Sequence, residues 1–139
     1  MLKLGLSPIF CTLFPMVKSD KKDHTEFIEK SVLHLEARGF DKIRVDLDGY
    51  DKPKSFLRKK NGTTVTPDIV ANKDGKRYFF EISLKTDEPQ LLKTKWVFLD
   101  ALSRMKSDAF RIITTKGHYK FTDNLLEDIN LSNKTPIKI

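Results

Sequence analysis

The sequence predicts an α/β domain in which helices flank a mixed central β-sheet. Three observations predict this fold class. Two β-rich runs, residues 64–73 and 76–86, meet at Asp74-Gly75, a dipeptide typical of a two-residue type I′ hairpin. A helical segment then joins the second run to another strand at 109–115, an order that makes those two strands parallel. An amphipathic segment before the sheet predicts a further helix.

The chain has 139 residues, which is enough for one domain with one core. We expect residues 21–139 to form this domain and residues 1–20 to be an apolar extension. Pro8 and Pro15 interrupt the extension and no small-residue cleavage site follows it, so it does not fit a signal peptide. It is also too short to span a bilayer, and Met16 could be the biological start. If ordered, the extension would cover a core edge or a second subunit of a homodimer.

The composition is that of a basic globular protein. Lys and Arg number 26 against 19 Asp and Glu, a formal net charge of +7. This balance favours a polyanionic partner such as DNA, although excess lysine also serves solubility. Cys11 is the only cysteine, which excludes an intrachain disulfide framework and predicts a reducing, cytoplasmic location. The three histidines lie too far apart in sequence to form a paired zinc motif.

The first helix is expected over residues 22–38, with Gly39 as its C-terminal stop. Its apolar residues recur at helical spacing and are Ile28, Val32 and Leu35. At 100° per residue, Glu29 lies beside this stripe and Glu26 lies nearly opposite it. We therefore expect the Glu29 side chain to lie at the edge of the core and point toward the sheet, and the Glu26 side chain to be exposed to solvent. The alternative for Glu29 is an ordinary glutamate at the boundary of the core.

The most basic stretch follows a half-buried strand predicted at residues 42–48. It is the loop 49–62, with a short strand around Phe56 and Leu57. Its cations, which could hold a phosphate backbone, are Lys52, Lys54, Arg58, Lys59 and Lys60. A solvated, flexible loop is the alternative interpretation.

The hairpin turn predicts which residues face each other across the two strands. Pairs are expected at Val70 with Phe79, Thr66 with Ser83, and Asp68 with Glu81. Like charges at such positions are destabilising, and apolar residues on both faces of the strands place this pair in a covered sheet. A divalent cation that bridges the two carboxylates is the favoured compensation. The alternative is a half-exposed hairpin end whose charges are screened by solvent.

A second helix is expected from residue 87 to about residue 106, with Pro89 in its first turn. One face would comprise Leu91, Phe98, Leu99, Leu102 and Met105. Lys95 falls inside this face, so its ammonium is expected at the rim, near the carboxylate pair, whereas Lys93 points away. Thr122 is expected to cap a short helix that ends at Ile129, and residues 136–139 are expected to form an edge strand.

Pro67-Asp68, twelve further residues and then Glu81-x-Ser83, in this order of elements, resemble the PD-(D/E)XK nuclease superfamily. The resemblance covers residues 25–115 and implies a restriction endonuclease-like αβββαβ core. It further implies hydrolysis of DNA phosphodiester bonds in repair, recombination or restriction. Asp68 and Glu81 would bind Mg²⁺ or Mn²⁺, and Glu29 matches the glutamate that the first helix often adds.

The sequence departs from this family at one catalytic position. The family's lysine, two residues after the glutamate, is Ser83 in this chain. Lys85 on the same strand or Lys95 on the following helix could substitute, and we favour Lys95. If neither does, the chain would be a degenerate nuclease-fold protein that acts as a nucleic-acid-binding or assembly module. A structural subunit that dimerises through its N-terminus is a third hypothesis.

Overall fold

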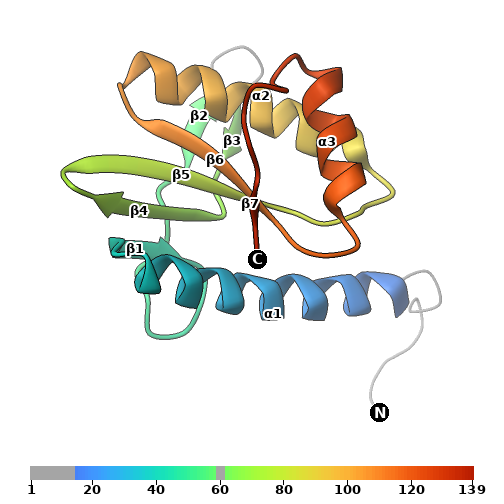
Figure 1. The fold of residues 1–139 in the computed structure, drawn as a ribbon, viewed down its shortest axis with the longest axis horizontal. Coiled ribbons are helices and arrows are strands. Elements are labelled where there is room, and N and C mark those ends of the chain that lie inside the picture. Colours follow the sequence, from blue (N-terminus) through green and yellow to red (C-terminus); the bar gives the residue numbers. More distant parts are fainter. Residues whose placement is uncertain (1–14, 59–61) are drawn as a thin grey trace.

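The computed structural model describes residues 15–58 and 62–139 and shows a mixed α/β fold (Figure 1). A five-stranded sheet lies between α1 on one face and α2 and α3 on the other. The elements in chain order are α1 (Pro15–Ala37), β1 (Asp41–Val45), β2 (Phe56–Arg58), β3 (Thr63–Val65), β4 (Ile69–Lys73), β5 (Lys76–Ser83), α2 (Pro89–Met105), β6 (Ala109–Thr114), α3 (Tyr119–Asp128) and β7 (Ile137–Lys138).

The central sheet has the strand order β1-β4-β5-β6-β7. β4 is antiparallel to both β1 and β5, whereas β6 is parallel to both β5 and β7. The predicted mixed sheet, the parallel crossover through α2 and the last edge strand are therefore confirmed. None of the helices in the described part of the chain is long and apolar enough to cross a membrane.

α1 begins at Pro15, earlier than the predicted residue 22. Its C-terminal end is as predicted, because Gly39 has φ +90° and the amide of Phe40 donates to the carbonyl of Leu35. This backbone pattern is the Schellman motif, in which a residue in the left-handed conformation ends the helix. The predicted apolar stripe is buried against the sheet, together with Phe27.

The tight turn at Asp74 and Gly75 sets the register of β4 and β5. Both residues have positive φ, +52° and +78°, as a type I′ turn requires. Val70 pairs with Phe79 as predicted, and the ladder ends at Ile69 and Phe80. The predicted pairing of Thr66 with Ser83 is wrong, because the chain leaves the ladder before Thr66.

The sequence predicts one β-rich run over residues 64–73, but in the structure residues 63–65 do not extend β4. Instead β3 pairs with β2 in a separate two-stranded sheet, whose Phe56 packs edge-on against Phe79 at 5.6 Å between ring centroids. β1 is also shorter than the predicted strand and is irregular between Asp41 and Arg44. Lys42 has φ +49° there, which is typical of a β-bulge.

The buried face of α2 differs from the predicted face. Trp96 and Leu99 are fully buried, whereas Leu91 and Met105 are 65% and 82% exposed. At 100° per residue, Met105 lies on the opposite side of the helix from Trp96. The buried face of α2 is therefore centred nearer to Trp96 than the sequence pattern predicted.

α3 begins one turn earlier than predicted. His118 is its N-cap residue, and Thr122 lies inside the helix with its side chain buried. Thr122 Oγ1 donates to the carbonyl of His118 and lies 2.6 Å from Ser83 Oγ. The prediction that Thr122 caps this helix is therefore wrong, because its hydroxyl group packs against β5.

Candidate active site

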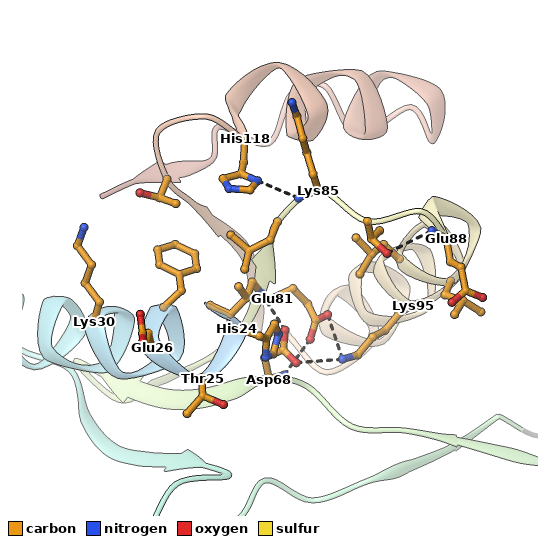
Figure 2. A pocket seen from close by; sticks show the side chains of 17 residues that line it. His24, Thr25, Glu26, Lys30, Asp68, Glu81, Lys85, Glu88, Lys95 and His118 are labelled. Carbon is orange, nitrogen blue, oxygen red and sulfur yellow. Dashed lines mark hydrogen bonds and ion pairs between the residues drawn. The ribbon is translucent and has the colours of Figure 1, made fainter. Parts of the chain in front are cut away.

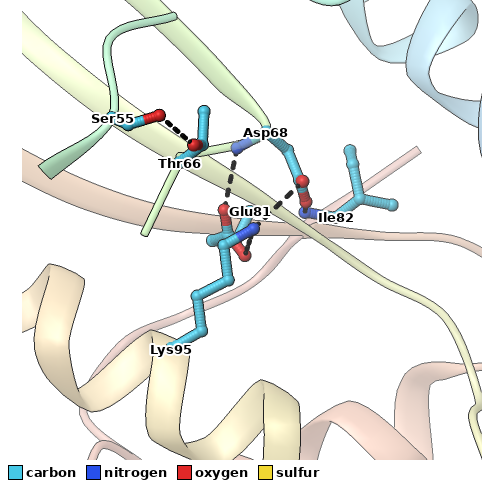
Figure 3. Close-up of polar contacts among 6 residues, drawn as sticks. All are labelled: Ser55, Thr66, Asp68, Glu81, Ile82 and Lys95. Atoms are coloured by element: carbon cyan, nitrogen blue, oxygen red, sulfur yellow. Dashed lines mark hydrogen bonds and ion pairs between the residues drawn. The ribbon is translucent and has the colours of Figure 1, made fainter. Parts of the chain in front are cut away.

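Three elements bring Asp68, Glu81 and Lys95 together (Figure 3). Asp68 immediately precedes β4, Glu81 lies on β5, and Lys95 extends from the second turn of α2. Lys95 Nζ lies 3.3 Å from Asp68 Oδ1 and 3.1 Å from Glu81 Oε1. The tight hairpin and the β5-α2 crossover therefore assemble this cluster from residues distant in sequence.

The backbone holds one oxygen of each carboxylate. The amide of Asp68 donates to Glu81 Oε2 at 2.8 Å, and the amide of Ile82 donates to Asp68 Oδ2 at 2.9 Å. The other oxygen of each carboxylate faces Lys95. Because the backbone bonds fix both side chains, the two remaining oxygens are preorganised to share one cation.

Glu81 is the most deeply buried member of the cluster, with no exposed surface on its side chain. Its Oε1 accepts no hydrogen bond from the described residues, and the Lys95 ammonium meets it as an ion pair. A buried carboxylate oxygen without a hydrogen bond is rare in folded proteins. Glu81 Oε1 thus retains lone pairs for a ligand.

Burial raises the pKa of Glu81 to about 8, and the negative charge of Asp68 adds to this effect while Lys95 opposes it. For Lys95, burial alone would lower the pKa. The charges of Glu81 and Asp68 outweigh burial, so the pKa of Lys95 is raised. Lys95 is therefore an ammonium ion at neutral pH, whereas Glu81 holds its proton more tightly than an ordinary glutamate.

The cluster lies in a cleft of about 840 Å³ (Figure 2). Its walls come from the middle of α1, the segment after β5, the start of α2, and the turn before α3. The charged and histidine side chains of the wall are His24, Glu26, Lys30, Asp68, Glu81, Lys85, Glu88, Lys95 and His118. A cleft of this size could hold a nucleotide-sized ligand.

Glu29 is not brought to the carboxylate pair, contrary to expectation. Its side chain is exposed and is not among the residues that line the cleft, whereas Glu26 lines it. α1 presents residues 24–27 and Lys30 to the cleft, which leaves Glu29 outside it. The offset of a glutamate from the apolar stripe was therefore not a sufficient criterion, because it gives only the angle around α1, whereas the cleft is lined chiefly by the helical turn at residues 24–27.

Lys85 also lies apart from the carboxylates. Its side chain is exposed and points away from Asp68 and Glu81 (Figure 2). Its backbone amide donates to His118 Nδ1 at 2.9 Å. Of the two predicted substitutes for the missing lysine, only Lys95 contacts both carboxylates.

The structure shows why position 83 does not carry a cation toward the cleft. The Ser83 side chain is fully buried beneath α3, beside the hydroxyl groups of Thr122 and Thr114. Thr114 Oγ1 also donates to the carbonyl of Ser83 at 3.0 Å. A lysine at this position would have to place its ammonium in a closed hydroxyl cluster.

The predicted basic loop is only partly described. Lys52 forms an exposed ion pair with Asp46 at 3.7 Å, and Arg58 lies over the Phe98 ring. Lys54 is exposed and lines a separate hollow. The remaining predicted cations, Lys59 and Lys60, lie outside the described residues.

His24 and His118 both line the cleft, and no spacing in the sequence predicts this, because α1 and the turn before α3 meet only in the folded chain. In residues 15–58 and 62–139, no three or more His, Cys, Asp or Glu side chains gather in a group that could hold a metal ion.

Comparison with protein-family models, with curated proteins and with solved structures finds no match.

Proposed function

We propose that this protein is a metal-dependent nuclease that hydrolyses phosphodiester bonds of DNA. The observation that carries the proposal is the contact of Lys95 with both Asp68 and Glu81 at the edge of a large cleft. In metal-assisted phosphoryl transfer, carboxylates can hold the metal ion and an ammonium can stabilise the charge that develops on the phosphate. The order of α1, β4, β5, α2 and β6, together with the excess of basic residues, supports a restriction endonuclease-like domain.

The carboxylates fit a divalent cation. Asp68 Oδ1 and Glu81 Oε1 already share one positive charge, and Glu81 Oε1 has no hydrogen bond. Proteins commonly bind Mg²⁺ through one or two carboxylates, with water and substrate phosphate completing the octahedron. The pair is therefore sufficient to hold Mg²⁺ or Mn²⁺ without a third acid. When bound, such an ion supplies Lewis acidity toward a phosphoryl oxygen and an attacking water.

Each residue of the cluster has a separate role in this proposal. Asp68 and Glu81 hold the ion, and their bonds to the backbone amides of Ile82 and Asp68 keep them oriented. Lys95 stabilises the negative charge that develops on the phosphate in the transition state. Its long side chain extends from α2 and holds the ammonium beside both carboxylates, where the metal-bound phosphate would lie.

The decisive experiment compares two lysines on the same helix. Lys95→Gln should lower DNA cleavage in Mg²⁺ or Mn²⁺ on the order of 10²–10³-fold. It should still bind the metal, because both carboxylates remain. Lys93→Gln is the matched control, since Lys93 pairs with Asp128 on α3 at 3.1 Å and does not reach the cluster. Asp68→Asn should remove both metal binding and cleavage.

One observation favours a second candidate, a nuclease-fold module that binds nucleic acid without cutting it. The pKa of Glu81 is raised to about 8, so Glu81 is largely protonated at neutral pH, the single charge of Lys95 balances that of Asp68, and the cluster is neutral without a metal. This candidate predicts salt-sensitive DNA binding that survives Asp68→Asn, and no heat of Mn²⁺ binding in calorimetry. If the folded protein cuts neither plasmid nor branched DNA in either metal, the enzyme proposal is wrong and this candidate replaces it.

A further inference from the structure

A second hollow, of about 210 Å³, lies over β1, β4 and β5 beside the start of β2. It shares no residue with the cleft that contains Asp68 and Glu81. Its floor is formed by Val70 and Phe79, which face each other across β4 and β5. The polar residues of its wall are Lys42, Arg44, Lys54, Asn72 and Arg77.

The wall of this hollow carries four cations and no acid. Lys42, Arg44 and Lys54 are exposed, and none of them is in an ion pair with a described residue. The irregular β1 backbone at Lys42 brings that residue and Arg44 to the same hollow, since a bulge redirects the side chains beside it. Like charges gathered without a counterion repel one another, so the hollow favours an anion.

Arg77 is the one cation of the hollow that is held in place. Its Nε and Nη2 donate to Asp108 Oδ2 at 3.0 and 2.6 Å, and its guanidinium lies 5.1 Å from the Phe79 ring centroid. Asp108 does not line the hollow. Because two of the five guanidinium N–H donors are used, the remainder stay available for an oxyanion.

The hollow and the candidate active site lie on the same face of β4 and β5. Side chains alternate between faces along a strand, so Glu81, Phe79 and Arg77 share one face of β5, and Val70 and Asn72, which pair with Phe79 and Arg77, lie on the same face of β4. Four residues along a strand span about 13 Å. Consecutive phosphates of one DNA strand advance about 3.4 Å along the helix axis, so for a duplex whose axis runs along these strands the span corresponds to about four nucleotides.

We propose that the hollow binds phosphates of a nucleic-acid backbone, a few nucleotides from the phosphate placed at Lys95. This inference rests on the proposed function, since it assigns the flanking contacts of the same substrate. The exposed side chains of Arg44 and Lys54 supply positive charge to the phosphates. The Arg77 guanidinium, which is held by Asp108, supplies hydrogen-bond donors in a fixed position. Recognition is of the backbone, because the hollow offers charge and amide donors but no aromatic surface beyond Phe56 and Phe79.

Binding measured without metal tests this inference separately from cleavage. A fluorescently labelled DNA duplex is titrated at several salt concentrations in EDTA, and the slope of log affinity against log salt is determined. The double variant Arg44→Gln/Lys54→Gln should reduce the magnitude of this slope by about two, because each lost phosphate contact removes about 0.9. Lys116→Gln/Lys120→Gln removes the same charge from exposed positions outside the hollow and should leave the slope nearly unchanged.

Three results would overturn the inference. In the first, both double variants reduce the slope equally, so the hollow has no special contact. In the second, the wild-type protein does not bind the duplex at all. In the third, inorganic phosphate competes as well as unlabelled duplex at equal phosphate concentration, which indicates a site for the free anion. The nuclease proposal is tested independently by Mn²⁺-dependent cleavage, so it can fail or succeed separately from each of these results.

Discussion

The amide of Asp68 donates a 2.8 Å hydrogen bond to Glu81 Oε2, so the backbone of one acid holds the side chain of the other. The reciprocal bond runs from the amide of Ile82 to Asp68 Oδ2. These bonds lower the free-energy cost of bringing two carboxylates together. In each carboxylate, a backbone N–H group replaces water as the hydrogen-bond donor to one oxygen. The remaining oxygens, Asp68 Oδ1 and Glu81 Oε1, both meet the Lys95 ammonium.

Stability should fall with rising pH in the absence of divalent ions. Glu81 has a pKa of about 8 in the folded protein against 4.5 when unfolded. Its proton therefore contributes stability that is complete below pH 4.5 and is lost as the pH rises through about 8. Lys95 does not offset this loss, because its raised pKa acts only at alkaline pH. Thermal unfolding measured from pH 5 to about 8 checks the slope.

The matched variants for this pH series are Glu81→Gln and Glu29→Gln. Glu81→Gln removes the titrating group while keeping the shape of the side chain, so the decline should flatten. Glu29→Gln changes an exposed glutamate and should leave the decline as in the wild-type protein. An unchanged pH profile in Glu81→Gln would show that another group causes the decline.

Metal binding should release protons. Glu81 must lose its proton to bind Mg²⁺ or Mn²⁺, and its pKa of about 8 means that much of it is protonated at neutral pH. Affinity for Mn²⁺ should therefore rise as the pH increases toward 8. Calorimetry in two buffers of different ionisation enthalpy measures the number of protons released. Equal heats in both buffers at pH 7 would contradict a site that includes Glu81.

Restoring a lysine at position 83 should harm the protein. Ser83→Lys would bury an ammonium beside Thr114 and Thr122, at a cost of several kcal/mol. The expected result is a large fall in the melting temperature with no gain in cleavage. Ser83→Ala is the control, and it should cost about 1–3 kcal/mol through the unpaired hydroxyl groups. A stable Ser83→Lys variant with faster cleavage would refute the assignment of Lys95.

The turn between β4 and β5 should be sensitive to a single methyl group. Gly75 has φ +78°, and Gly75→Ala would place an alanine in the left-handed region at a cost of about 1–2 kcal/mol. No atom lies within 4 Å of the added Cβ, so the cost is conformational and not steric crowding. Chemical denaturation measures it. A substitution without effect would contradict the type I′ turn on which the register depends.

Local sequence signals were sufficient for much of the fold. Asp74-Gly75 determined the turn and the pairing of Val70 with Phe79, because only residues that tolerate positive φ fit there. Gly39 determined the end of α1 for the same reason. The apolar spacing predicted α1, α2 and β6, although it misjudged which side of α2 is buried. The proximity of Asp68 and Glu81 also followed from the turn, although the ladder ends at Ile69 and Phe80, one pair before them.

Long-range packing decided what surrounds that pair. The sequence left Lys85 and Lys95 as alternatives, and only the crossing of α2 over the sheet brings Lys95 to the carboxylates. Likewise, the packing of α3 on Ser83 and the side of α1 that faces the cleft depend on contacts between distant segments. The spacing of residues determines the direction in which their side chains point from one helix or strand. The position of one helix or strand against another depends on the apolar surface that all of them bury together in the core.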